Sequence, residues 1–142
     1  MKFWDSSAIV ALLIDEPAHS SARSLLEDDA SMMAWWATPI ECVSAIARRE
    51  REQDMAPAEA SDAISQLQAL SREWSEVLAT DMVRNIAQRI LRVHPLRAAD
   101  SQQLAAAIVA AEGEPQTLEF VSLDHRLNEA ALKEGFPVTV PE

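Results

Sequence analysis

Short strand-like segments alternate with helical segments along the whole chain, and no tight hairpin signal joins any two strands. Strands are predicted at residues 2–4, 32–37, 76–79, 117–123 and 137–140, and helices at 8–14, 17–28, 38–53, 58–74, 81–93, 101–112 and 126–134. Strands separated by helices pair in parallel, because each connection crosses back over the sheet. The pattern predicts one α/β domain over residues 1–142, with a parallel sheet of about four or five strands flanked by helices on both faces.

Composition excludes several kinds of site. Cys42 is the only cysteine, which excludes an internal disulfide and a cysteine-based metal cage and fits a reducing cytoplasm. Gly113 and Gly135 are the only glycines, so a glycine-rich phosphate loop or dinucleotide fingerprint is excluded. The chain starts without a signal-peptide layout, and no apolar run approaches the ~18 to 20 residues that span a bilayer. We therefore expect a cytoplasmic protein without a membrane segment.

The chain is strongly acidic, with 12 basic and 23 acidic residues and a net charge of −11. This balance argues against a protein that holds nucleic acid on a broad cationic face. It does not exclude nucleic-acid chemistry, because a bound divalent metal supplies positive charge of its own.

Four acids fall where a site is expected in a parallel α/β fold. Asp5 ends the first strand and Asp124 ends the strand near residue 120, while Glu41 and Asp100 begin helices at the same rim. Two unit charges ~4 Å apart repel by about 4 kcal/mol at an effective dielectric near 20, so such a cluster must take up protons or bind a cation. Oxygen-only ligands favour Mg²⁺ or Mn²⁺. A metal-activated water suits phosphate-ester cleavage.

Each of these acids also has a purely structural interpretation. Thr38 and Glu41 form a capping-box pattern, Asp100 can cap the helix at 101–112, and Asp5 and Asp124 can cap the helices that follow them. Taken singly, each structural role is the more common one. The expected position of all four acids at the same rim favours a functional site.

Four segments together resemble the PIN-domain ribonucleases, in particular the VapC-type toxins of bacterial toxin–antitoxin pairs. They occur in that family's order and at its usual spacings, at residues 5–10, 39–41, 99–107 and 120–127. The similarity covers essentially the whole chain, and its first and last segments are the most specific. Two departures are mild: Gln102 and Gln103 stand where many relatives have apolar residues or His, and Ser122 replaces a more common Thr.

The resemblance implies a PIN-like fold and an endoribonuclease that depends on Mg²⁺ or Mn²⁺. It implies that a cognate antitoxin protein silences the enzyme and that the chain forms a homodimer. By position, it assigns the acidic metal-site and catalytic roles to Asp5, Glu41, Asp100 and Asp124. Two hydroxyl residues, Ser7 and Ser122, match positions that support these acids.

Two other functions remain open on the sequence alone. Asp5 could be the nucleophile of an aspartyl phosphatase, although Ser7 stands where such an enzyme usually has a second acid. The acidic rim could instead dock a basic peptide without catalysis. Covalent trapping of a phosphoaspartate would identify a phosphatase, and metal-dependent turnover would separate an enzyme from a binding module.

Aromatic and basic residues offer weaker signals. Trp35 and Trp36 are predicted to point to opposite faces of one strand, each covered by helices. A basic cluster, Arg48, Arg49 and Arg51, is more simply a solvated helix surface paired with neighbouring glutamates than an RNA guide. The same two interpretations, a solvated surface or an RNA guide, apply to a later set: Arg84, Arg89, Arg92 and Arg97.

Overall fold

The sheet is parallel throughout. The structure, a computed structural model, describes residues 1–142. Its strands are β1 (Lys2–Trp4), β2 (Met32–Trp35), β3 (Ser75–Val77), β4 (Glu119–Val121) and β5 (Val138–Thr139). They form one sheet in the order β3-β2-β1-β4-β5, and every neighbouring pair is parallel. The predicted fold class is confirmed.

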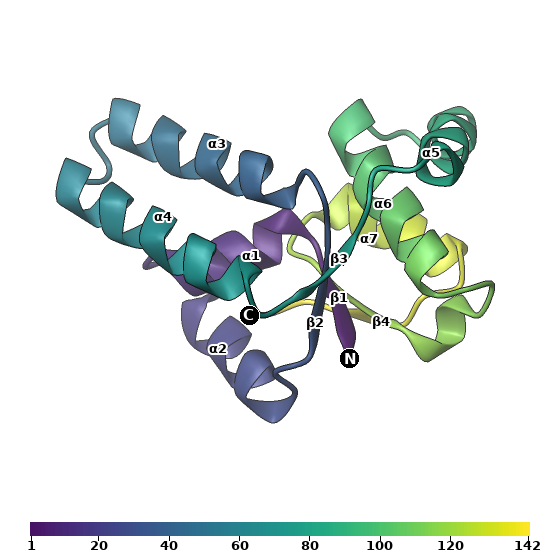
Figure 1. Cartoon of the computed structure of the whole chain (residues 1–142), viewed down its shortest axis with the longest axis horizontal. Helices are drawn as coiled ribbons and strands as arrows, with labels where there is room; N and C mark the ends of the chain where they lie inside the picture. Colours follow the sequence, from purple (N-terminus) through teal and green to yellow (C-terminus); the bar gives the residue numbers. More distant parts are fainter.

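Seven helices form the two outer layers. Helices α1 (Ser6–Leu13), α2 (His19–Asp28), α3 (Thr38–Arg51) and α4 (Pro57–Ser71) cover one face, and α5 (Asp81–Val93), α6 (Ala98–Ala110) and α7 (His125–Lys133) cover the other (Figure 1). A short 3₁₀ turn, Pro115–Thr117, precedes β4. No helix combines the length and the apolar character that a bilayer crossing requires.

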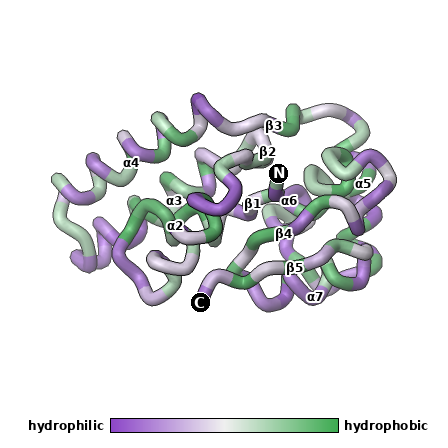
Figure 2. The backbone as a smooth tube through the Cα atoms, turned by 90° about the horizontal axis from the view of Figure 1, so that it is seen from below, coloured by the Kyte–Doolittle hydropathy of each residue, from purple (hydrophilic) through white to green (hydrophobic).

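Alternating strand residues divide the core into two parts. Trp4 and Val121 pack under α1–α4, whereas Phe3 and Phe120 pack under α5–α7, where their rings stack 5.5 Å apart. All four side chains are fully buried, which is typical of a sheet covered on both faces. The surface helices bury one side only: in Figure 2, α4 alternates between hydrophilic and hydrophobic residues along its length.

The strand order reverses between β1 and β4. The chain runs from β1 outward to β2 and β3, and then returns to add β4 and β5 on the other side of β1. Asp5, just after β1, donates its backbone N–H to Val121 O at 2.9 Å, so the carboxyl ends of the two strands are held together. Crevices at such reversal points are where ligands bind in parallel α/β folds.

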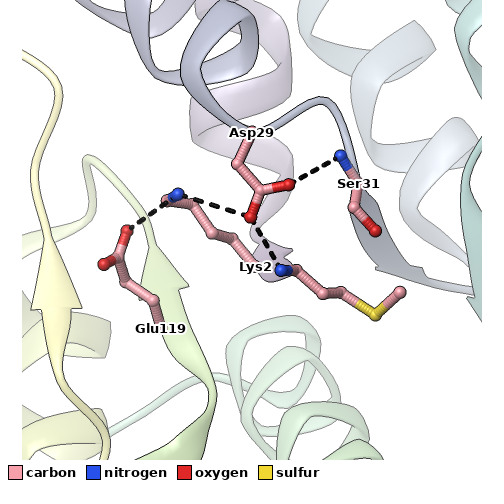
Figure 3. Close-up of polar contacts among 5 residues, drawn as sticks. Lys2, Asp29, Ser31 and Glu119 are labelled. Carbon is pink, nitrogen blue, oxygen red and sulfur yellow. Dashed lines mark hydrogen bonds and ion pairs between the residues drawn. The ribbon is translucent and has the colours of Figure 1, made fainter.

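An ion-pair network closes the opposite, amino edge of the sheet (Figure 3). Lys2 Nζ lies 3.6 Å from Asp29 Oδ2 and 3.7 Å from Glu119 Oε2, and Asp29 Oδ2 also contacts the Met1 ammonium at 2.7 Å. Asp29 Oδ1 accepts a hydrogen bond from Ser31 N at 3.0 Å. These contacts link β1 to β4 and to the turn before β2. They lie at the end of the sheet opposite to Asp5 and Asp124.

Three local predictions were wrong. Trp36 follows β2 and is half exposed rather than covered. The Thr38–Glu41 capping box does not form, because Thr38 is the first residue of α3 rather than its N-cap, and the N-cap, Ala37, makes no side-chain hydrogen bond. Asp100 is not a cap either: α6 begins at Ala98, which places Asp100 inside the first turn.

Other helices and strands begin or end at residues that differ from the predicted ones, without any change in the fold. The predicted helix 58–74 ends at Ser71, so Trp74 lies beyond it although it is buried. The strand predicted at 117–123 is only Glu119–Val121, because a 3₁₀ turn occupies its first residues. Asp5 and Asp124 do cap α1 and α7, as one interpretation expected.

Candidate metal centre

All four predicted acids line one cavity at the carboxyl edge of the sheet. The cavity has a volume of about 660 Å³, and its polar lining includes Asp5, Glu41, Asp100 and Asp124. Asp5 and Asp124 come from the ends of β1 and β4, while Glu41 and Asp100 come from the first turns of α3 and α6. The structure thus brings together residues up to 119 positions apart in the chain.

Asp5 is held through one of its two carboxylate oxygens. Asp5 Oδ2 accepts hydrogen bonds from Ser7 Oγ at 2.6 Å, Ser7 N at 3.2 Å and Ser122 Oγ at 3.1 Å. The same hydroxyls continue the network, because Ser7 Oγ accepts from Leu123 N at 2.9 Å and Ser122 Oγ accepts from Asp124 N at 3.0 Å. Ser7 and Ser122 therefore orient Asp5 and tie it to the β4–α7 turn that carries Asp124.

Glu41 is held through both of its oxygens. Ser6 Oγ, from α1, donates to Glu41 Oε1 at 3.1 Å, and Gln103 Nε2, from α6, donates to Glu41 Oε2 at 3.0 Å. Gln103 Nε2 also donates to Thr38 Oγ1 at 3.0 Å, and both Gln103 and Thr38 are fully buried. These contacts explain why Thr38 does not cap its helix.

Gln103 and Ser6 were not predicted as functional residues. A signal for Gln103 exists in the sequence: it lies three positions after Asp100 and so on the same side of the helix. Ser6 carries no such signal, because a serine next to a helix start is usually explained by capping.

Burial and mutual repulsion weaken the acids. Burial raises the pKa of Asp5 above its ordinary value, the charge of Asp124 adds to the rise, and hydrogen bonds oppose it. Burial and then the charge of Asp5 raise the pKa of Glu41 to about 7. Burial, followed by the charges of Asp124 and Asp5, raises the pKa of Asp100 to about 6. Such a cluster favours the arrival of a proton or a cation.

The donor set fits a hydrated hard cation. No three acidic, histidine or cysteine side chains are grouped closely enough to enclose an ion by themselves. Asp5 Oδ1, Asp124 Oδ2 and both oxygens of Asp100 accept no hydrogen bond from the protein. Mg²⁺ typically keeps several waters and takes only one or two carboxylates together with substrate phosphate. The four oxygens are suited to that mode of binding, and their role as ligands stays a prediction.

Arginines reach the cavity from α3. Arg48 and Arg49 both line it, so they are more than a solvated helix surface. Arg49 pairs with Glu16 at 3.0 Å and with Asp54 at 3.7 Å, not with the neighbouring glutamates as expected. Arg48 makes no ion pair, and Arg51 is exposed.

Comparison with known proteins identifies the family. The sequence profile described as the PIN domain matches residues 2–133. The chain belongs to the PIN domain family. This PIN domain is 33% identical over 141 residues to ribonuclease VapC45 of Mycobacterium tuberculosis (strain CDC 1551 / Oshkosh), over 94% of this chain and 90% of the relative. Identity and coverage are the same for ribonuclease VapC49 of strain ATCC 25618 / H37Rv.

Solved structures share the fold of this PIN domain. Mycobacterium tuberculosis VapC20, described as a sarcin-ricin loop cleaving toxin, has a TM-score of 0.70 at 19% identity, over 96% of each chain. A chain of a toxin–antitoxin complex from Klebsiella pneumoniae has a TM-score of 0.67 at 16% identity, over 100% of this chain and 98% of that one. The resemblance found in the sequence is confirmed.

Proposed function

We propose that this PIN domain is a divalent-metal-dependent endoribonuclease that acts as the toxin of a toxin–antitoxin pair. The ribonuclease assignment rests on the family match and on the two relatives named ribonuclease VapC. The observation that carries the mechanism is the cavity in which four acids meet, three of them with a raised pKa. The phosphatase alternative gains no support, because Ser7 binds Asp5 where a phosphatase would have its second acid.

The four acids differ in how many of their carboxylate oxygens accept hydrogen bonds. Asp5, Asp100 and Asp124 offer carboxylate oxygens without hydrogen bonds, and these three acids together with Glu41 are the residues that would hold Mg²⁺ or Mn²⁺. A bound ion of this kind activates water and neutralises charge on a phosphodiester. Glu41, whose two oxygens both accept hydrogen bonds, would be held in one orientation toward that ion by Ser6 and Gln103.

Partners follow from the same family evidence. The similar chain from Klebsiella pneumoniae was solved as a toxin–antitoxin complex, and we expect this chain to bind a cognate antitoxin. We also expect a homodimer that acts on RNA in the cytoplasm.

The decisive experiment incubates the purified, antitoxin-free chain with structured RNA in Mg²⁺, in Mn²⁺ and in EDTA. Cleavage is expected with either metal and not with EDTA. Asp5→Asn keeps the side-chain volume but removes a charge, so activity should fall at least about 100-fold. Asp62→Asn, at an exposed position on α4, is the matched control and should cleave normally. RNA that stays intact under every metal condition, with protein shown to be folded, would refute the proposal.

A further inference from the structure

A second hollow adjoins the acidic cavity. It has a volume of about 360 Å³ and lies between the start of α6 and the start of α7, lined by Pro95, Leu96, Arg97, Asp100, Asp124 and Arg126. Asp100 and Asp124 line both hollows, so they form the wall between them. A group bound in the second hollow would therefore lie next to any ion held by these two acids.

The two arginines of this hollow are available for a ligand. Neither Arg97 nor Arg126 forms an ion pair, although acids outnumber basic residues 23 to 12 in the chain. By contrast, Arg49, Arg84 and Arg89 are all paired with carboxylates. Both arginines are exposed, so binding a ligand would not require breaking an internal contact.

Arginine favours one class of ligand at this place. A guanidinium group presents a planar fork of N–H donors that matches the oxygens of a phosphate. Helix α6 also begins at the hollow, and its first N–H groups, which no side chain caps, favour a negative charge.

We propose that this hollow binds a backbone phosphate of the RNA, beside the acidic cavity and between Arg97 and Arg126. The assignment rests on the proposed nuclease function and adds the position of the substrate to it. Because Asp100 and Asp124 face the same hollow, their charges oppose an anion until a divalent ion neutralises them. Phosphate binding is thus coupled to metal binding.

The test measures binding rather than cleavage. A fluorescently labelled RNA with phosphorothioate linkages, which resist hydrolysis in Mg²⁺, is titrated with the full chain in Mg²⁺ and in EDTA, at several salt concentrations. Arg97→Gln and Arg126→Gln are compared with Arg72→Gln, an exposed and unpaired arginine at the end of α4. Thermal unfolding verifies that every variant is folded.

In Mg²⁺, each of the two hollow variants should bind RNA about 3- to 10-fold more weakly, and the salt dependence should fall by about one phosphate contact. Arg72→Gln should bind as the wild type does, and in EDTA all four proteins should bind equally weakly. Wild-type affinity in both hollow variants, or the same loss in EDTA as in Mg²⁺, would overturn the proposal.

Failure of the nuclease function is a separate result. Unmodified RNA that stays intact in Mn²⁺ would refute the nuclease, while a metal-dependent loss of binding in the two hollow variants would still establish the phosphate site. Where RNA is cleaved, the same variants should raise KM more than they lower kcat, because they act on binding.

Discussion

Gln103 Nε2 donates to Glu41 Oε2 at 3.0 Å and thereby joins α6 to the acidic turn of α3. Its other donor hydrogen is used by Thr38, and its own carbonyl oxygen is buried without a partner. An apolar side chain would fill this space without that unpaired oxygen. The donor function toward Glu41 therefore explains why a glutamine stands here.

Gln103→Leu should weaken Mn²⁺ binding by about 10- to 100-fold, because groups that orient metal ligands contribute on that scale. Electron paramagnetic resonance of free Mn²⁺ gives the affinity without any RNA. The neighbouring change Gln102→Leu, at a half-buried position outside the acidic cavity, is the control and should leave the affinity unchanged. Equal affinity in wild type and Gln103→Leu would show that the contact only fills space.

Asp100→Asn should change how stability depends on pH. Burial and neighbouring charges raise the pKa of Asp100 to about 6, from an ordinary 3.8. The folded chain therefore holds this proton more tightly than the unfolded chain, so the stabilisation is complete below pH 3.8 and is lost as the pH rises through 6. In EDTA, the variant should unfold a few degrees above the wild type at pH 8, with the difference vanishing near pH 4.

Calorimetry in chelator across that range measures the effect, with Asp62→Asn as an exposed control that should follow the wild type at every pH. A variant that is less stable than the wild type at pH 8 would instead assign Asp100 a purely structural role.

Divalent metal should stabilise the folded chain. A ligand that binds only the folded state adds about 2.7 kcal/mol at 100 times its dissociation constant, which corresponds to several degrees for a domain of this size. Mn²⁺ should therefore raise the unfolding temperature of the wild type, and EDTA should reverse the change. Asp5→Asn should respond much less. An identical response in both proteins would place the ion elsewhere.

Ser122→Ala should destabilise the fold itself. Ser122 is fully buried, donates to Asp5 and accepts from Asp124 N, so alanine leaves a backbone N–H at the start of α7 without its acceptor. The expected loss is about 1–3 kcal/mol in the free energy of unfolding, measured in urea. Ser65→Ala, at an exposed position on α4, should cost far less. Wild-type stability in Ser122→Ala would show that water replaces the hydroxyl.

The fold could be predicted because its signals are local. Strands between helices specify parallel pairing, and the 3.6-residue period of apolar residues located every helix. The predictions were wrong where tertiary contacts determine the end of a helix or strand. Trp74 continues an apolar helical stripe, yet its indole N–H donates to Glu76 at 3.3 Å beyond the helix end. Trp36 was expected under a helix, but β2 ends before it.

The acids of the site could be predicted from their places at strand and helix ends, but their partners could not. Thr38 and Glu41 match a capping pattern, and only the packing of α6 against α3 shows that Gln103 engages both. Likewise, Arg97 and Arg126 are 29 positions apart, and no sequence period brings them to one hollow.

The one-sided anchoring of Asp5 has a practical consequence. Since all its hydrogen bonds converge on Oδ2, an incoming cation meets an oxygen whose direction is already set and which no protein group must first release. Folding already orders the Asp5 carboxylate, so binding of the ion at Asp5 should require little rearrangement.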